Sequence, residues 1–369
     1  MLFTDVFEDV TKYGKKIPTS EYLESGKYPI VDQGQSNISG YTNEENGLFT
    51  DVPVVIFGDH TRAVKYVDTP FFLGADGVKI LKSKISDVNY KYLYYAVSSV
   101  NIPNTGYNRH FKWLKETDIQ IPTKEKQLKI VETIDNLACL IDLHNKQLEQ
   151  LDELVKARFI ELFGDPMTNP LGWDKVNIST VVNGKVSNGF FAKRDDYCDD
   201  GNVEVLGVGN VVNRMYSNIN NLPKTKGTNI DIDKYGVKYG DMLFCRSSLV
   251  AEGIGKASII PKGTPNNVLF ECHVIRLPLN LDKCVPEFMQ VLSTTDYFRN
   301  QVVAQSKTAT MTTIGQDGIL KTDIILPPLE LQKQFLLFVE QIDKSKFEIQ
   351  QSLEKLETLK KSLMQQYFG

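Results

Sequence analysis

Two hydrophobic stretches of the chain run into short loops that each carry a single arginine. Phe57-Gly58-Asp59-His60-Thr61-Arg62 follows one stretch, and Phe244-Cys245-Arg246-Ser247 follows the other. A guanidinium group stays charged and presents five N–H donors in one plane, so it suits hydrogen bonding to a partner rather than proton transfer. These polar positions therefore indicate binding rather than bond-making chemistry.

Patterns that would support catalysis or metal binding are missing from the sequence. Gly253-Ile254-Gly255-Lys256 has neither the spacing of a GxxxxGK[ST] phosphate loop nor a helical pattern after it, and no GxGxxG motif follows a strand. Cys272-His273 is typical of buried structure, because a free cysteine packs as a small hydrophobe. No second histidine stands at a useful spacing from His110. We therefore expect no catalytic residue, no metal site and no cofactor.

Composition indicates a globular protein of two or three domains. The chain has 369 residues, of which 41% are hydrophobic, against roughly 150 residues for an ordinary domain. Its five cysteines form no CxxC pair, which argues against a zinc ribbon and a disulfide scaffold. The first residues resemble no signal peptide, and no stretch approaches the roughly 18 apolar residues of a membrane span. We expect a cytoplasmic protein with no membrane partner.

The net charge of −4 limits one class of function. No segment of the chain is basic, whereas strong non-specific binding of nucleic acid normally needs a basic face. If the protein binds DNA, its cations must be locally focused, or a partner must supply much of the attraction for phosphate.

The chain contains an internal repeat that bears on how its parts are positioned. Residues 117–122 read TDIQIP and residues 322–327 read TDIILP, an offset of 205 residues. The match continues without a gap to Phe163-Gly164 against Phe368-Gly369, with Gln127 against Gln332 on the way. Chance rarely produces an ungapped match with the apolar positions in step, so we interpret the chain as two copies of one plan.

Each copy of the repeat predicts one long helix. Prolines stand only before the first turn, and about 40 residues at 1.5 Å each would extend about 60 Å, longer than a domain of this size usually buries. A core-facing helix would also show an apolar stripe, but the steps of four and three residues predict a coiled coil between the two helices. The predicted seam comprises Ile130, Ile134, Leu137, Ile141, Leu148 and Leu151 in the first copy, and Phe335, Val339, Ile342, Ile349, Leu353 and Leu356 in the second.

Two polar residues, His144 and Lys346, interrupt this seam. They could be ligands or switches, but a polar seam residue more often fixes the register of a coiled coil. We favour the structural interpretation for both.

The remaining segments alternate β-branched and aromatic stretches with turn signals, which predicts strands and a helix in each copy. The helix is expected at 89–99 in the first copy and at 285–303 in the second, and residues 202–212 read as a strand. The predicted fold class is α+β: two globular mixed α/β domains alternate with two long helices that pair as an antiparallel coiled coil. The expected boundaries are 1–121 and 165–326 for the domains, and 122–164 and 327–369 for the helices.

The sequence resembles the DNA-specificity subunit of a Type I restriction-modification system. TDIQIPTKEKQLKIVETID, LEQLDELVKARFIELFGDPMTNPLGW and the closing TDIILPPLELQKQFLLFVEQID carry the resemblance. It implies that each globular part is a target-recognition domain for one half of a bipartite double-stranded DNA site. It also implies that the coiled coil separates the two domains and docks two methyltransferase subunits, which restriction subunits then join. The chain itself would be non-catalytic.

The resemblance directs attention to loop residues that could contact DNA. Base edges are read by Arg, Lys, Asn and Gln, and phosphates by Lys, Arg, Ser and Thr. Arg–guanine is the commonest specific contact, which favours Arg62, Arg109, Arg194 and Arg246. The full set of candidates is Gln33, Gln35, Asn37, Arg62, Asn104, Tyr107, Asn108, Arg109 and Lys112 in the first domain, and Ser187, Asn188, Lys193, Arg194, Arg214, Arg246, Ser247, Lys307, Thr308 and Thr310 in the second.

Three other hypotheses stay open from the sequence. The chain could be a coiled-coil adaptor that binds only proteins, which predicts no sequence-selective retention of DNA. It could be a single-chain nuclease, which predicts metal-dependent cleavage, although the expected acidic and histidine constellation is missing. It could also serve a related phage-defence system that uses the same recognition plan.

Overall fold

The computed structural model describes residues 1–74, 76–103, 105–106, 108–308 and 311–369, and it divides into two compact units. The first unit comprises Met1–Lys146 and Ile349–Gly369, and the second comprises Gln147–Glu348. Each unit therefore combines one globular part with a portion of each of two long helices, α4 (Lys124–Phe163) and α10 (Leu329–Phe368).

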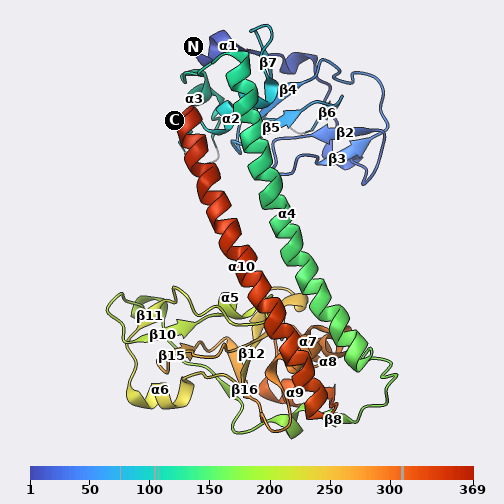
Figure 1. The fold of residues 1–369 in the computed structure, drawn as a ribbon, viewed down its shortest axis with the longest axis vertical. Helices are drawn as coiled ribbons and strands as arrows, with labels where there is room; N and C mark the ends of the chain where they lie inside the picture. The colour runs from blue at the N-terminus through green and yellow to red at the C-terminus, as the bar shows by residue number, and fades with distance from the viewer. Residues whose placement is uncertain (75, 104, 107, 309–310) are drawn as a thin grey trace. The chain divides into compact units, whose positions relative to one another are not determined.

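The two long helices pair in opposite directions. The N-terminal part of α4 shares the first unit with the C-terminal part of α10, and the reverse holds in the second unit (Figure 1). Both predicted helices are present, and the expected pairing is confirmed. Neither of them, nor any other helix among the described residues, is long and apolar enough to cross a membrane.

The predicted seam residues differ in burial along these helices. Those near the start of each helix are buried and the others are mostly half-buried. The buried ones are Ile130, Ile134, Leu137, Phe335, Val339, Ile342 and Leu353, and the half-buried ones are Ile141, Leu148, Leu151, Ile349 and Leu356. The seam side chains are therefore most buried where a helix also packs against a globular part.

Both polar seam residues bond to the facing helix. His144 Nε2 lies 3.1 Å from Ser352 Oγ in the first unit, and the Lys346 ammonium pairs with the Asp152 carboxylate in the second. These bonds favour one alignment of the helices, as expected of polar residues in a coiled coil.

The first globular part contains two sheets. A four-stranded antiparallel sheet has the order β1-β7-β4-β5, and a three-stranded sheet has the order β3-β2-β6 with β2 and β6 parallel. Its elements are α1 (Phe3–Val6), β1 (Phe7–Asp9), η1 (Thr11–Tyr13), η2 (Thr19–Glu21), β2 (Tyr28–Val31), β3 (Gly40–Thr42), β4 (Val54–Gly58), β5 (Val64–Val67), β6 (Phe72–Leu73), β7 (Val78–Ser83), α2 (Tyr90–Ser98) and α3 (Phe111–Lys115).

The second globular part is built on the same two sheets. The four-stranded sheet has the order β14-β12-β16-β9, and a three-stranded sheet has the order β11-β10-β15 with β10 and β15 parallel. Its elements are β8 (Lys175–Asn177), η3 (Ile178–Val181), β9 (Ser187–Asn188), η4 (Arg194–Asp196), β10 (Val203–Leu206), α5 (Val208–Val211), β11 (Lys224–Thr225), α6 (Asn229–Tyr235), β12 (Asp241–Cys245), β13 (Ser247–Ser248), η5 (Ala251–Gly253), β14 (Ala257–Ile259), β15 (Val268–Phe270), β16 (Val274–Pro278), α7 (Pro286–Thr294), α8 (Asp296–Ala304), β17 (Lys307–Thr308), β18 (Thr312–Thr313), α9 (Gln316–Leu320) and β19 (Asp323–Ile325).

The repeat therefore extends into the globular parts. The fully buried central strand is β4 in one copy and β12 in the other, and each is followed by a loop that contains the predicted arginine. The amphipathic helix α2 corresponds to α7, and α3 corresponds to α9. The sequence similarity between these segments is weak, but the strand order of the four-stranded sheet is the same.

A buried glutamine connects each long helix to its globular part. Gln127 Oε1 accepts from the Asn89 N–H at 2.9 Å, and its Nε2 donates to the Pro122 carbonyl at 2.8 Å. Gln332 Oε1 accepts from the Val285 N–H at 2.8 Å, and its Nε2 donates to the Pro327 carbonyl at 2.8 Å. Asn89 and Val285 cap the N-termini of α2 and α7. The repeated glutamine therefore aligns the same two helices in both copies.

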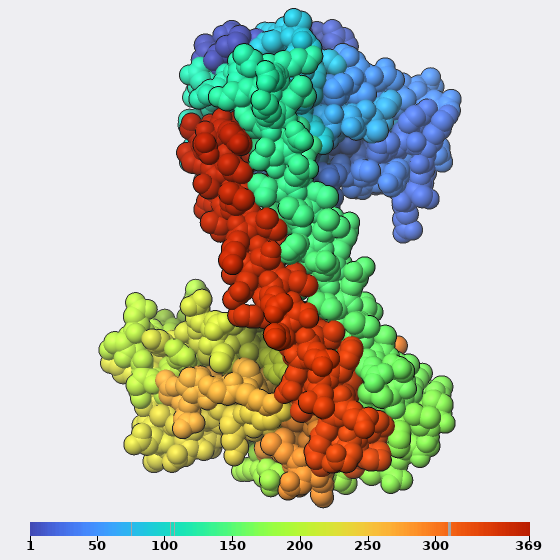
Figure 2. Space-filling model, in the orientation of Figure 1, coloured from blue at the N-terminus to red at the C-terminus, as the bar shows by residue number. Residues whose placement is uncertain are grey.

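The end of each long helix packs on the amphipathic helix of the other copy's globular part. The Phe163 ring lies 4.8 Å from Phe288 of α7 and 5.6 Å from Phe335, in a fully buried cluster. The Phe368 ring lies 5.3 Å from Tyr92 of α2, where the C-terminal part of α10 covers the first globular part (Figure 2). The Phe-Gly endings of the repeat therefore close two equivalent cores.

Two of the expected elements are corrected by the structure. The helix expected at 285–303 is two helices, α7 and α8, because Thr295 is extended between them (φ −71°, ψ 152°). The strand expected at 202–212 ends at Leu206 and is followed by the short helix α5. There the Asn210 side chain accepts the Gly207 N–H at 3.0 Å, which starts a helical turn instead of continuing the strand.

Candidate nucleic-acid interface

Three loops of the first globular part are joined through Asp59, which follows β4. The Asp59 carbonyl accepts the His110 N–H at 2.8 Å and lies 3.0 Å from His110 Nδ1. Its carboxylate accepts the Phe111 N–H at 2.8 Å, and its own N–H donates to Gly77 at 2.6 Å. Asp59 and His110 are both buried, so this network holds the loop after β4, the turn before β7 and the segment before α3 together.

Gln33 at the end of β2 belongs to the same network. Its Oε1 accepts the His60 N–H at 3.2 Å, and its Nε2 donates to the Asp76 carbonyl at 2.9 Å. Gly77 has φ +91°, and a Cβ added there would lie 2.7 Å from Gln33 Oε1. Gln33, which was predicted to read a base, therefore uses both ends of its side-chain amide to hold these loops in place.

Arg62 is held in a defined direction. It adopts φ +62°, a left-handed conformation that is uncommon for a residue with a side chain. Its N–H donates to the Gly58 carbonyl at 2.7 Å, and its Nη1 donates to the Ile102 carbonyl at 3.1 Å. One donor of this guanidinium is thereby fixed to the backbone.

The other predicted residues of this part fall into two groups. Gln35, Asn37, Asn108, Arg109 and Lys112 are exposed, whereas Asn104 and Tyr107 lie outside the described residues. The Asn108 side-chain amide donates to the Thr105 carbonyl, and the Lys112 ammonium lies 4.9 Å from the centre of the Trp113 ring.

A buried lysine anchors the loop that carries Gln33, Gln35 and Asn37. Lys65 Nζ donates to the Asp32 carbonyl at 2.8 Å and to the Ser36 carbonyl at 2.5 Å. Burial lowers the pKa of Lys65, while the neighbouring Asp32 carboxylate opposes that change. Burial alone would raise the pKa of Asp32, but bonds from Ser39 and the Gly34 N–H, together with Lys65, lower it. The two groups form a charged anchor beneath the polar loop.

Three predicted residues of the second globular part meet in one small sheet. Ser247 lies in β13, and Lys307 and Thr308 form β17; β18 joins the two strands. Ser247 pairs with Thr313, which in turn pairs with Lys307. The loop after β12 and the segment before α9 are far apart in sequence, so only the fold brings these residues together. Thr310 lies outside the described residues.

Arg246 connects this three-stranded ribbon, β13–β18–β17, to the turn before β16. Its Nη1 donates to the Cys272 carbonyl at 3.1 Å, and its backbone N–H donates to the His273 carbonyl at 2.9 Å. The Arg246 carbonyl accepts the Ile314 N–H at 3.0 Å, and His273 Nδ1 lies 3.3 Å from Ser247 Oγ. As with Arg62, one donor of the guanidinium is fixed to a backbone carbonyl.

The remaining candidates occupy different places. Ser187 and Asn188 form the edge strand β9, paired with Arg276 and Ile275 of β16. Lys193 and Arg194 are exposed at the start of η4.

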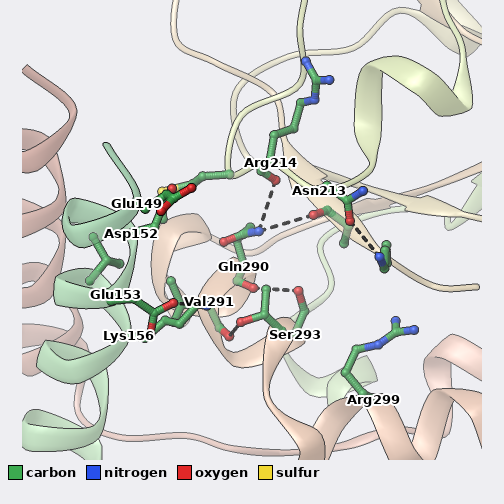
Figure 3. A pocket seen from close by; sticks show the side chains of 15 residues that line it. Glu149, Asp152, Glu153, Lys156, Asn213, Arg214, Gln290, Val291, Ser293 and Arg299 are labelled. Carbon is green, nitrogen blue, oxygen red and sulfur yellow. Dashed lines mark hydrogen bonds and ion pairs between the residues drawn. The ribbon is translucent and has the colours of Figure 1, made fainter. Parts of the chain in front are cut away.

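Arg214 does not join the ribbon. It lines a cavity of about 670 Å³ between α4 and the globular part, with its side chain directed away from Gln290 (Figure 3). Its guanidinium donates to the Val212 and Gly209 carbonyls at 3.3 and 3.2 Å. Its prediction as a base-reading residue rested on residue type alone.

Several residues that shape these faces were missed by sequence reasoning. Asp59, Lys65 and His110 are buried polar residues whose partners are distant in sequence, so no local signal marked them. Gln127 and Gln332 did carry a signal, because they match across the repeat offset, but their role requires the positions of α2 and α7.

The described part of the chain contains no group of three or more His, Cys, Asp or Glu that could hold a metal ion. Burial raises the pKa of Glu287, which accepts hydrogen bonds from Tyr239 at 3.1 Å and Tyr216 at 3.3 Å. That carboxyl lies inside the second globular part. The polar faces themselves offer amides, hydroxyls and guanidiniums, the groups that pair with base edges and phosphates.

Comparison with known proteins identifies related chains. The family model described as the Type I restriction modification DNA specificity domain matches residues 3–153 and 170–361. The EcoKI specificity subunit of Escherichia coli is 23% identical over 278 residues, which cover 68% of this chain and 57% of that protein. The MjaVIII specificity subunit of Methanocaldococcus jannaschii is 23% identical over 96% of this chain and 89% of that protein. Against the EcoKI and EcoR124I/EcoR124II subunits, the match spans only 57% and 36% of the relative's length.

Solved structures share the fold. The S subunit of a Type I restriction-modification system from M. genitalium superposes with a TM-score of 0.59 at 14% identity, covering 99% of this chain and 94% of that one. A chain from a study of complex assembly and conformational transition of the type I R-M system gives a TM-score of 0.54 at 13% identity, covering 100% and 95%. The resemblance seen in the sequence is confirmed.

Proposed function

This chain belongs to the Type I restriction modification DNA specificity family, and from that premise we propose that it recognises a bipartite double-stranded DNA target. Each globular part would read one half of the target. The chain would bind and position the DNA, while methyl transfer and cleavage would belong to its partner subunits.

The observation that carries this proposal is the contrast within the repeat. Buried features recur in both copies: the order of the four-stranded sheet, the glutamine at the helix start and the aromatic helix end. The polar loops around Arg62 and Arg246 differ in length and composition. A repeated scaffold with two different polar faces fits two different half-sites held by one support, as the symmetry of a dimer mirrors its operator.

We further propose that the paired helices space the two recognition parts and seat two methyltransferase subunits. An internal two-fold repeat offers two equivalent surfaces, which suits two identical partners. Restriction subunits would then join the complex. Because no segment is basic, these partners would also supply part of the attraction for the phosphate backbone.

The proposal is tested by the methylation pattern that the chain directs. The chain is co-expressed with the methyltransferase subunit encoded beside it, in a host without other methylation, and modified bases are sequenced genome-wide. The expected result is one split motif that is methylated in both halves. Replacing residues 165–321 by the corresponding part of another family member should change one half only.

Other outcomes point to the alternative hypotheses. A stable complex without methylation and without sequence-selective DNA retention would favour a protein-binding adaptor. Metal-dependent cleavage by the purified chain alone would favour a nuclease. A split motif read with different effector subunits would favour a related phage-defence system.

A further inference from the structure

The ribbon β13–β18–β17 ends in exposed apolar side chains. Leu249 follows β13 and is 82% exposed, the largest fraction among the exposed large hydrophobic residues of the described chain. Val250 beside it is 57% exposed and Met311 is 37% exposed. A single exposed leucine is ordinary, but a group of apolar side chains at one tip often marks an interaction site.

The strand register places two of these residues at the same end of the ribbon. Ser247 pairs with Thr313 and Ser248 pairs with Thr312. Leu249 directly follows Ser248 and Met311 directly precedes Thr312, so both residues continue from the same end of this ladder. The body of the ribbon carries hydroxyl groups, with Thr308 opposite Thr312 and Lys307 at the end of β17. The ribbon is therefore polar along its length and apolar at its tip.

Hydrogen bonds fix the segment that follows Val250, whereas the apolar side chains themselves do not join the protein core. The Gly255 N–H donates to the Cys245 carbonyl at 2.8 Å, and Arg299 Nη2 donates to the Glu252 carbonyl at 3.1 Å. The Val250 N–H donates to Ser248 Oγ at 3.3 Å. Leu249, Val250 and Met311 belong to none of the hydrophobic clusters of the described residues. Folding of the described chain thus leaves Leu249 largely exposed and Val250 and Met311 partly exposed.

We propose that Leu249 and Met311 form an apolar wedge that enters between base pairs in the half-site read by the second globular part. This inference rests on the proposed function, because it takes the same DNA as the partner. DNA-bending proteins insert leucine, methionine or similar side chains between base steps, and the burial gained offsets the lost stacking. Lys307 and the ribbon hydroxyls would contact the flanking phosphates.

The surroundings of the tip favour DNA over a protein partner. Lys307 lies on the outer strand β17, and Arg246 directly precedes the other outer strand, β13. His273 Nδ1 lies 3.3 Å from Ser247 Oγ of β13. Cations and hydroxyls beside an apolar tip match the alternation of phosphates and base faces. With such a wedge, recognition of this half-site would depend on how easily the DNA deforms. Pyrimidine–purine steps open most easily and would therefore be favoured at the wedge.

Among the described residues, the loop after β4 of the first globular part carries no such apolar tip. Its loop after β4 closes within Asp59–Arg62, where the Gly58 N–H donates to the Ala63 carbonyl at 2.8 Å. No large hydrophobic residue stands in that loop.

The test uses the full chain in complex with its methyltransferase subunit, bound to the target motif. 2-Aminopurine replaces single bases of the half-site assigned to residues 165–321, apart from the methylated base and its neighbours, which the methyltransferase itself unstacks. Its fluorescence at the remaining positions reports unstacking. We expect a several-fold increase at one step with the natural chain, and no increase after Leu249→Ala combined with Met311→Ala. Leu249→Phe should keep the increase, because it preserves an apolar wedge.

Leu281→Ala is the matched control. Leu281 is 45% exposed and contacts Gly240 at the opposite end of β12, so the same truncation there should leave the fluorescence unchanged. The wedge is disproved if the double variant keeps the increase, if the natural complex shows none in this half-site, or if Leu281→Ala has the same effect. A double variant that keeps the fluorescence increase but loses the methyltransferase subunit would assign the tip to a protein interface.

Failure of the proposed function would look different. A natural complex that binds all DNA sequences equally, or none, would remove the DNA-specificity role and the wedge with it. Selective binding of the split motif without local unstacking would overturn only the wedge.

Discussion

The two globular parts share their buried framework and differ around the loops that follow their central strands. α3 and α9 are offset by the same 205 residues as the long helices, whereas α2 and α7 are offset by 196. The second part thus has nine more residues between these helices, in the region that holds α8 and the strands β17 and β18. Its loop from β12 to β14 is also longer than the loop from β4 to β5.

This difference shows where the two copies were free to change. Residues that pair strands or fill the core must fit many neighbours at once, so their replacement is costly. Solvent-facing loops make few such contacts and tolerate insertions. The framework has therefore stayed equivalent while the polar faces, which would set the target, have diverged.

Removal of the aromatic helix ends should have the largest effect and tests whether the two cores are equally tight. Phe163 is fully buried among Phe159, Phe288 and Phe335, whereas Phe368 is half-buried against Tyr92. We expect Phe163→Ala to lower the free energy of unfolding by about 3–5 kcal/mol and Phe368→Ala by less. Urea unfolding measures both, and a larger loss for Phe368→Ala would reverse the comparison.

The buried glutamines should respond alike, because their bonds are equivalent. Gln127→Leu and Gln332→Leu each leave a backbone N–H and a carbonyl without a partner, which costs about 2–4 kcal/mol in all. Hydrogen exchange of the β4 and β12 amides would report each globular part separately. Gln334→Leu, an exposed position on α10, is the control. A loss in only one copy would show that the two frameworks are not equivalent.

The arginine loops should separate the two half-sites. Arg62→Ala and Arg246→Ala should each reduce discrimination at one half by about 1–3 kcal/mol, the contribution of one bidentate base contact. Methylation rates on targets with single-base changes in either half provide the measurement. Lys112→Ala is a useful control, because loss of an exposed cation should weaken binding without changing which base is preferred. Wild-type discrimination in both halves would exclude the arginine as a reader.

The smallest effect concerns pH and only the second globular part. Burial raises the pKa of Glu287 above its usual 4.5, so the folded chain holds this proton more tightly than the unfolded chain. The resulting stability is complete below about pH 4.5 and is lost as pH rises through the raised pKa, no more steeply than about 1.4 kcal/mol per pH unit.

Glu287→Gln should therefore flatten the dependence of the urea midpoint on pH. Part of the slope should remain, because burial also raises the pKa of Asp343. The corresponding position of the first part is Lys91, which pairs with Asp135 at 2.7 Å near the surface. Asp135→Asn should change stability by at most about 1 kcal/mol, because the amide oxygen can still accept from the Tyr95 hydroxyl and only the partly exposed ion pair is lost. An unchanged slope in Glu287→Gln would show that this carboxyl does not titrate in that range.

The sequence by itself determined the repeat, the two long helices and the family. These features depend on local patterns: the spacing of Ile130, Ile134 and Leu137, the proline before each helix, and the phrase that recurs at a fixed offset. A helix period or an ungapped match can be read without knowing which distant residues meet, so the expected pairing of the helices was correct.

Only the tertiary structure decided how the polar residues are used. Gln33 and Arg214 remain predicted DNA contacts, and the structure adds that Gln33 ties loops together and that Arg214 lines a cavity beside α4. Ser247 and Lys307 lie in one sheet because β18 joins their strands. The type of a polar side chain shows which bonds it can make. The partner it finds depends on chain segments that are far away in sequence, and these are brought close only when the core is formed.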